Sequence, residues 1–172
     1  MLRTEAEIAQ VLRYYQARTG RVLTICTVES ATGGRIADRI TNMSGSSDYF
    51  LGSVVSYSDQ VKVATIGVTR ATLDSHGAVS EQTALEMAHG GRKLLGADVC
   101  VSDTGIAGPT GDSPGKPVGL FYLGLAAEDA SLCQRHQFSL DREQNKRDAA
   151  QAALDMLKDY LLERVAGIQN TE

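Results

Sequence analysis

The hydrophobic pattern of this chain alternates between two periods, which predicts strands that alternate with helices. Short apolar runs rich in β-branched residues predict buried strands over 22–28, 50–57 and 98–102. Apolar residues that recur at intervals of three and four predict helices at 4–19, 34–40, 59–66, 80–95 and 141–161. Two more apolar runs, 118–127 and 131–138, are separated by a short polar turn and predict neighbouring strands. The pattern therefore predicts an α/β domain with helices on both faces of a mixed sheet.

Polar residues and glycines mark several of the predicted helix ends. Thr4 and Glu7 have the spacing of a capping box, in which Thr4 accepts a backbone N–H and Glu7 reaches back. Ser80 stands where it can cap the helix that follows it. Gly20 and Gly96 stand where helices end, because glycine adopts the left-handed conformation of a C-cap.

Length and composition indicate one globular domain, which we expect to span residues 1–172. The hydrophobic content of 42% and the charged content of 22% exclude extensive disorder. The net charge of −4 argues against a broad basic face for nucleic acid. No apolar segment reaches the ~20 residues that cross a bilayer, and the start of the chain lacks the pattern of a secretory signal. The three cysteines form no CxxC pair, so we expect reduced thiols in a cytoplasmic protein.

A glycine-rich turn at 29–34 follows the first predicted strand and leads into a helix. Ligands of open α/β sheets bind beyond the carboxyl ends of strands, and free N–H groups at a helix start attract anions. Ser30 and Thr32 supply hydroxyls, while Gly33 and Gly34 allow the backbone to approach a ligand closely. The segment fits either a site for an anionic or polar group or an ordinary strand-to-helix turn with a hydroxyl cap.

A second glycine-rich segment, 104–111, follows the strand predicted over 98–102. Its glycines at 105, 108 and 111 do not match the GxGxxG motif of dinucleotide-binding folds. Pro117 follows Gly115 and Lys116 where a Walker A loop has Ser or Thr, so that loop is also excluded. The segment fits either a backbone cradle around a polar ligand or a long turn before the next strand.

Tyr57 and Lys62 lie where the strand over 50–57 gives way to a helix. A lysine beside an amphipathic tyrosine is commonly solvated. If both side chains line a dry pocket, burial lowers the pKa of Lys62, and its neutral amine becomes a usable base. The three histidines lack the spacing of paired metal ligands, so we expect neither a metal site nor a cofactor.

Short motifs of this kind occur in a fixed order from about residue 5 to residue 162. They are ESATGG at 29–34, GSS at 45–47 with YF at 49–50, VVSYS at 54–58, HGAVSE at 76–81, TGIAGP at 104–109 and KPVG at 116–119. Together they resemble the CinA C-terminal domain family, also described as the nicotinamide mononucleotide deamidases. The resemblance extends over nearly the whole chain.

The resemblance implies a fold and an activity. The implied fold is a three-layer α/β/α sandwich with a mixed five-stranded sheet. The implied activity is metal-independent hydrolysis of nicotinamide mononucleotide to nicotinic acid mononucleotide and ammonia, without a cofactor. The partner is then a small nucleotide rather than nucleic acid or membrane, and a homodimer is implied. Larger members carry a preceding molybdopterin-binding-like domain, so this chain resembles the stand-alone form.

The resemblance also assigns residues to the site. Ser30 corresponds to the proposed nucleophile and Lys62 to its base, with Tyr57 beside them. Substrate binding is assigned to both glycine-rich segments, at Ala31, Thr32, Gly33, Gly34, Thr104, Gly105, Ile106, Ala107 and Gly108. Ser46, Ser47 and Arg142 correspond to positions that hold the nucleotide. The sequence alone does not rank Ser46 or Ser47 against Ser30 as the nucleophile.

The chemistry of an amide fits this assignment. A neutral Lys62 takes the proton of Ser30 as the hydroxyl attacks the amide carbon, and then passes it to the departing ammonia. The N–H groups of the turn at 30–34 are the expected donors to the tetrahedral oxyanion, and one such donor is worth ~3–4 kcal/mol.

Four positions depart from the family's pattern. Ala31 stands where most relatives carry Cys, which disfavours a cysteine nucleophile here. Asp103 stands where a small hydroxyl residue is usual and places a carboxylate near the second glycine-rich segment. Leu140 replaces a usual Gly and Lys146 a usual Arg. Two alternatives stay open: a nucleotide-binding module without catalysis, and a hydrolase of another small amide or ester.

Overall fold

The computed structural model describes residues 3–111 and 113–169, without the side chains of residues 168 and 169. Its α-helices are α1 (Thr4–Thr19), α2 (Arg35–Thr41), α3 (Asp59–Val61), α4 (Arg70–His76), α5 (Glu81–Leu95) and α6 (Arg142–Gln169). Its strands are β1 (Ile25–Glu29), β2 (Phe50–Val55), β3 (Val99–Gly105), β4 (Leu120–Ala126) and β5 (Ser131–Gln137). A 3₁₀ turn, η1 (Ser46–Asp48), precedes β2, and a π turn, η2 (Lys62–Ile66), follows α3.

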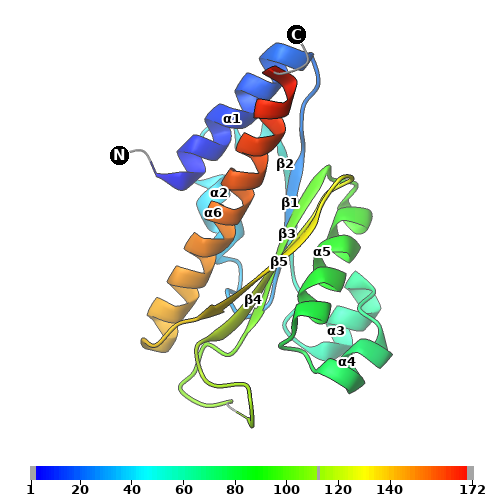
Figure 1. Ribbon diagram of the computed structural model, residues 1–172, viewed down its shortest axis with the longest axis vertical. Helices are drawn as coiled ribbons and strands as arrows, with labels where there is room; N and C mark the ends of the chain where they lie inside the picture. Colours follow the sequence, from blue (N-terminus) through cyan, green and yellow to red (C-terminus); the bar gives the residue numbers. More distant parts are fainter. Residues whose placement is uncertain (1–2, 112, 170–172) are drawn as a thin grey trace.

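The strands form one mixed sheet in the order β2-β1-β3-β4-β5. Both β2 and β3 run parallel to β1, whereas β4 is antiparallel to β3 and to β5. The few residues between β4 and β5 allow only an antiparallel pair, because a parallel crossover needs a dozen or more. Helices α1, α2 and α6 cover one face of the sheet, and α3, α4 and α5 cover the other (Figure 1). The three-layer α/β/α fold with a mixed five-stranded sheet is therefore confirmed.

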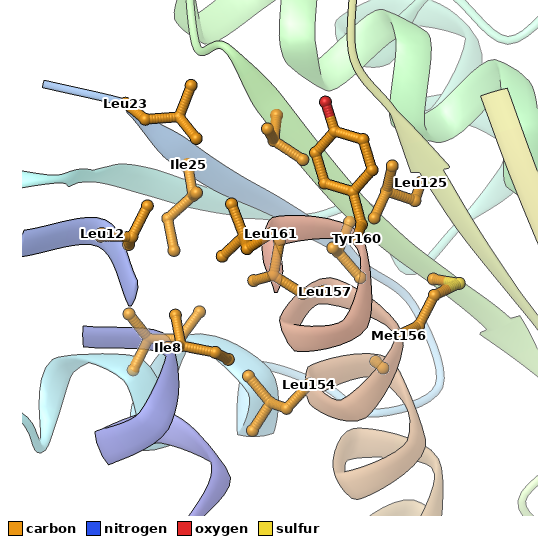
Figure 2. Packing of buried hydrophobic residues seen from close by; sticks show 14 of the residues in the cluster. Ile8, Leu12, Leu23, Ile25, Leu125, Leu154, Met156, Leu157, Tyr160 and Leu161 are labelled. Carbon is orange, nitrogen blue, oxygen red and sulfur yellow. The ribbon is translucent and has the colours of Figure 1, made fainter. Parts of the chain in front are cut away.

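The larger apolar cluster lies between the sheet and the pair of helices α1 and α6. Figure 2 shows Leu12 of α1 and Leu157 and Leu161 of α6 beside Ile25 of β1 and Leu125 of β4. All five side chains are buried. This packing fixes one face of β1, the strand that carries the candidate site at its end. Across the described ranges of the chain, no helix is both long and apolar enough to cross a membrane.

On the opposite face, α5 lies directly on the sheet because of glycines. A Cβ at Gly91 of α5 would overlap the Cγ2 atom of Val28 in β1 and stand 2.8 Å from Sγ of Cys100 in β3. A Cβ at Gly124 of β4 would stand 2.5 Å from the carbonyl oxygen of Ala84 in α5. Side chains at Gly91 and Gly124 would force the helix and the sheet apart.

Two local predictions are wrong. Thr4 does not cap α1, since its hydroxyl donates to Oδ1 of Asp155 in α6 at 3.0 Å, and Glu7 pairs with Lys158 of α6 at 3.5 Å. The α1–α6 contact therefore takes both residues of the supposed capping box. Helix α4 was absent from the predicted elements, because it carries a single buried residue, Leu73, and so lacks an apolar stripe.

Other predicted helix ends are confirmed. The hydroxyl of Ser80 accepts the backbone N–H of Thr83 at 3.2 Å and so caps α5. Gly20 and Gly96 adopt φ of 71° and 67°, the left-handed conformation that ends α1 and α5.

Candidate active site

The site forms where the parallel strands end. Ser30 directly follows the last residue of β1, and Tyr57 lies two residues beyond the end of β2. Thr104 is the residue before the last in β3, the strand on the other side of β1. Because parallel strands present their carboxyl ends at one edge of the sheet, segments distant in sequence meet there.

Lys62 lies behind Ser30, at the first position of η2. The amine Nζ is 3.1 Å from Oγ of Ser30, 2.8 Å from the carbonyl oxygen of Ser56 and 3.2 Å from that of Tyr57. Only 1% of the Lys62 surface is exposed, and Ser30 is also buried. The solvated-lysine interpretation is therefore wrong, because the amine ends inside the protein against one hydroxyl and two carbonyls.

The surroundings of the Lys62 amine favour its neutral form more than water does. Burial lowers the pKa of Lys62, and the carboxylates of Asp59 and Asp103 partly oppose this effect. A neutral amine has two N–H donors and one lone pair. The carbonyls of Ser56 and Tyr57 take the two donors, which leaves the lone pair facing the hydroxyl of Ser30. In this state the amine can accept the hydroxyl proton.

The first glycine-rich turn is tied to a buried carboxylate, Glu29. Its oxygens accept the backbone N–H groups of Gly34, Ile36 and Ala37 at 2.8, 3.1 and 2.8 Å. They also accept the hydroxyl of Thr32 at 2.6 Å. Three N–H groups at the start of α2 are thus satisfied within the chain. The interpretation of this helix start as a free anion site is therefore wrong, because Glu29 occupies these N–H groups.

A second buried carboxylate, Asp103 of β3, lies on the other side of the turn. Its Oδ1 accepts the N–H of Ser30 at 3.0 Å, and its Oδ2 accepts the N–H of Thr32 at 3.1 Å. The hydroxyl of Thr32 also contacts Asp103. Asp103 therefore faces the backbone of the turn and does not line the cavity that Ser30 borders.

Not all N–H groups of the turn at 30–34 are free to donate to an oxyanion. The N–H groups of Ser30, Thr32 and Gly34 are occupied by carboxylates. Within the described residues, the N–H groups of Ala31 and Gly33 have no hydrogen-bond partner. Ala31 also borders the cavity, so its N–H is the available donor next to the Ser30 hydroxyl.

A cavity of about 260 Å³ opens in front of Ser30. This volume is near the lower end of small-molecule sites, which typically enclose about 300–1,000 Å³. The residues around it are Ser30, Ala31, Tyr57, Ala78, Val79, Thr104, Gly105, Ile106, Ala107, Gly108, Thr110, Gly111 and Arg142. The structure thus brings Ser30 and Ala31 of the first glycine-rich segment together with the second segment, Tyr57 and Arg142. Gly33 and Gly34 do not line the cavity.

The second glycine-rich segment forms a rigid wall of this cavity. The hydroxyl of Thr104 donates to the carbonyl oxygen of Ala78 at 2.7 Å, which attaches the loop after α4. A Cβ at Gly105 would overlap the buried ring of Phe121, so only glycine fits there. Asn145 of α6, fully buried, donates to the carbonyl oxygen of Ala107 at 3.1 Å.

Two cationic side chains of α6 lie near the two glycine-rich segments: Arg142, which lines the cavity, and Lys146, which lies beside Gly33. Arg142 donates to the carbonyl oxygen of Gly108 at 2.7 Å and to the hydroxyl of Tyr57 at 3.1 Å. It thereby joins the two walls of the cavity. Lys146 lies one helical turn further, with Nζ 3.4 Å from the position a Cβ of Gly33 would take. Neither cation forms an ion pair with a carboxylate in the described ranges of the chain. Their positive charge suits an anionic group of a ligand.

Several predicted site residues lie elsewhere. Ser46 and Ser47 belong to η1, which precedes β2. Because β2 runs parallel to β1, η1 lies near the amino end of β1. Ser30 follows the opposite, carboxyl end of the same strand. Neither serine lines the cavity of this chain, and it is Ser30 that the Lys62 amine reaches. Thr32 is fully buried, and its hydroxyl is held by Glu29 and Asp103, so it supports the turn from behind.

Sequence reasoning missed the roles of several residues. Glu29 and Asp103 hold the turn, and Asn145 anchors the opposite wall. Ala78 and Val79 line the cavity, although their only signal was a place in the HGAVSE motif. Asn145 carried no signal, because a polar residue in the first turns of an amphipathic helix is normally exposed. The described residues hold no group of three or more His, Cys, Asp or Glu side chains that could share a metal ion.

Comparison with curated proteins yields close relatives. A CinA-like protein of Salinibacter ruber (strain DSM 13855 / M31) is 50% identical over 151 residues, which is 88% of this chain and 35% of the relative. A CinA-like protein of Kosmotoga olearia is 44% identical over 158 residues, which is 92% of this chain and 38% of the relative. The chain thus spans little more than a third of the length of these curated relatives.

Solved structures match the fold over almost their full length. The competence damage-inducible protein A (ComA) from Klebsiella pneumoniae superimposes with a TM-score of 0.84 at 31% identity, covering 94% of this chain and 98% of that chain. CihA from Agrobacterium tumefaciens gives a TM-score of 0.82 at 35% identity, covering 91% and 96%. The model of the CinA C-terminal domain matches residues 7–161. On this evidence the chain belongs to the CinA C-terminal domain family.

Proposed function

We propose that this chain is a metal-independent amidohydrolase that converts nicotinamide mononucleotide to nicotinic acid mononucleotide and ammonia. The observation that carries the proposal is the buried amine of Lys62, 3.1 Å from the Ser30 hydroxyl at the edge of a cavity. The substrate follows from the resemblance of the motifs to the deamidases. The cations Arg142 and Lys146 support an anionic substrate such as a mononucleotide.

The proposed reaction begins at Ser30. Its Oγ bonds to the carboxamide carbon while its proton moves to the neutral Nζ of Lys62. The oxyanion that forms lies near the Ala31 N–H, since hydrolases of other folds also use the N–H that follows the nucleophile. The carbon–nitrogen bond then breaks as Lys62 returns the proton to the leaving ammonia. Water, deprotonated by Lys62, hydrolyses the resulting ester, releasing the acid and restoring Ser30.

The cavity provides separate surroundings for the two ends of the substrate. Apolar atoms of Ala31, Ile106 and Ala107 suit the pyridine ring next to Ser30. Arg142 lines the same cavity and Lys146 lies beside Gly33, and we expect these two cations to bind the phosphate of the nucleotide. In keeping with the resemblance, we also propose that the protein acts as a cytoplasmic homodimer.

Two alternatives share this site. A cavity of about 260 Å³ is small for a whole nucleotide, which favours hydrolysis of a smaller amide or ester by the same pair. A binding module without catalysis keeps the cations but makes no use of the amine. Assays with several pyridine nucleotides and small amides, together with calorimetry, separate the three cases.

The central test is ammonia release from nicotinamide mononucleotide by the wild type, Ser30→Ala and Lys62→Met. We expect turnover by the wild type and a loss of about 10³-fold or more in each variant, as for other nucleophile–base pairs. Matched controls are Ser131→Ala and Lys93→Met, which remove an exposed hydroxyl and an exposed amine far from the cavity. Both controls should keep wild-type turnover. Equal activity in Ser30→Ala and the wild type would overturn the assignment, and tight binding without any turnover would establish the binding module.

A further inference from the structure

The proposed mechanism does not use Asp103, which is fully buried directly behind the nucleophile. Both of its oxygens accept N–H groups of the turn, from Ser30 at 3.0 Å and from Thr32 at 3.1 Å. Asp103 belongs to β3, whereas the turn continues β1, so the carboxylate fastens the ends of two strands to each other. Ser30 is thereby bound on two sides: its N–H to Asp103, and its hydroxyl to Lys62.

The two buried carboxylates, Glu29 and Asp103, share a single hydroxyl hydrogen. The hydroxyl of Thr32 contacts both Glu29 and Asp103, yet it has only one hydrogen to donate. Three backbone N–H groups stabilise the charge of Glu29. Burial, together with the neighbouring charge of Glu29, raises the pKa of Asp103 to about 6 against the hydrogen bonds from Thr32 and Ser30 that oppose it. Asp103 therefore carries its charge above about pH 6.

The charge of Asp103 acts on Lys62. The carboxylates that raise the pKa of Lys62 against the effect of burial are Asp59, on α3, and Asp103, on β3. Asp59 is exposed and Asp103 is fully buried, so solvent screens only the former. The charge of an ionised Asp103 thus opposes deprotonation of the Lys62 amine, while its hydrogen bond holds the N–H of Ser30.

We propose that Asp103 is a positioning residue of the Ser30–Lys62 pair, because its two carboxylate oxygens hold the backbone of the turn that carries Ser30. The groups that face Asp103 are the carboxylate of Glu29 from β1, and the hydroxyl and N–H of Thr32 and the N–H of Ser30 from the turn. The amine of Lys62 is not a hydrogen-bond partner of Asp103, but it feels the charge of that carboxylate. The structural part of the proposal is independent of the substrate, and only its effect on turnover rests on the proposed function.

The decisive experiment needs no substrate. NMR of ¹³C-labelled lysine follows the titration of Lys62, whose signal is identified by its loss in Lys62→Met. Asp103→Asn and the matched variant Asp59→Asn each remove one negative charge near the amine. We expect the Lys62 midpoint to fall in both. Amide exchange at Ser30 or Thr32 should accelerate by about tenfold or more in Asp103→Asn alone, because this variant replaces one of the two acceptor oxygens by an NH2 group.

Kinetics supply a second readout. If the protein is the proposed amidase, the acidic limb of the kcat profile shifts to lower pH in both variants, since less charge opposes deprotonation of Lys62. The plateau of kcat falls only in Asp103→Asn, and KM stays the same, because Asp103 lies outside the cavity wall. Asp103→Ser, which carries the small hydroxyl usual in the family, serves as a second variant for folding. Unchanged exchange at both Ser30 and Thr32 in folded Asp103→Asn and Asp103→Ser would overturn the proposal, whether or not turnover is found.

Discussion

Lys62 illustrates how one side chain links stability to reactivity. A buried amine at 1% exposure loses the solvation of its charged form, and the two carbonyls beside it replace only part of that solvation. The same burial that lowers the pKa of Lys62 prepares it to accept the proton of Ser30. Burial of the Lys62 amine thus destabilises the folded state and at the same time makes the amine a better base.

The pH dependence of unfolding tests this cost. Because the folded pKa of Lys62 lies below its ordinary 10.5, the unfolded chain binds more protons between the two values. Stability should therefore rise with pH across that window, and the penalty should be complete below the folded pKa. Other groups, such as Cys133 and Tyr160 with their raised pKa values, also change stability in this range, but they do so equally in all variants. From about pH 7 to 10.5, the free energy of unfolding in urea should therefore change more positively with pH in the wild type and in the control Lys93→Met than in Lys62→Met. A Lys62→Met protein with the wild-type slope would contradict the burial argument.

At the scale of elements, close contact between α5 and the sheet determines how far apart the layers stand. Gly91 lets the helix rest against Val28 of β1, two residues before Ser30 in the chain, and against Cys100 of β3. A larger residue would lift α5 and disturb the strand ends. The composition of α5 alone predicts the reverse, because alanine favours a helix over glycine by about 1 kcal/mol.

We therefore predict opposite signs for two glycine-to-alanine changes. Gly91→Ala should destabilise the fold by about 1–2 kcal/mol, since overpacking of about 1–3 kcal/mol outweighs the gain in propensity. Gly167→Ala in α6, where a Cβ meets nothing within 4 Å, should stabilise it by up to about 1 kcal/mol. Urea unfolding of both variants measures the difference. Stabilisation by Gly91→Ala would show that the helix can shift without cost.

For the whole molecule, the two edges of the sheet differ in character. The edge strand β2 and its flanks carry no charged residue from 49 to 58, and Leu51 and Val55 are each 46% exposed. The other edge, β5, carries Arg135 and His136. Charges discourage strands from pairing with other chains, whereas an uncharged apolar edge favours it.

The proposed homodimer should accordingly form through β2. Sedimentation should give a mass of about twice 18.4 kDa. Leu51→Lys should shift the protein to monomers, because a charge on the edge opposes pairing. The control Leu132→Lys places the same charge at a 43% exposed leucine of β5 and should leave the dimer intact. A monomeric wild type, or a dimer broken only by Leu132→Lys, would reject this interface.

Local patterning was sufficient for much of this protein. Alternating periods of apolar residues identified each strand and most helices, because burial on one face is recorded every second or every third to fourth residue. The motifs also pointed to Ser30 and Lys62, whose pairing the structure places at 3.1 Å. Helix α4 escaped because one buried leucine makes no period.

Contacts between distant segments were beyond reach of the pattern. The strand order β2-β1-β3 puts Asp103 against the turn of Ser30. The parallel direction of β1 and β2 puts Ser46 and Ser47 at the ends of the strands that lie away from Ser30. Thr4 likewise bonds to α6 rather than to its own helix end. A polar side chain looks the same in sequence whether it caps a helix, holds a catalytic turn or faces water. Its partner depends on which elements become neighbours, and that is decided by packing the whole chain at once.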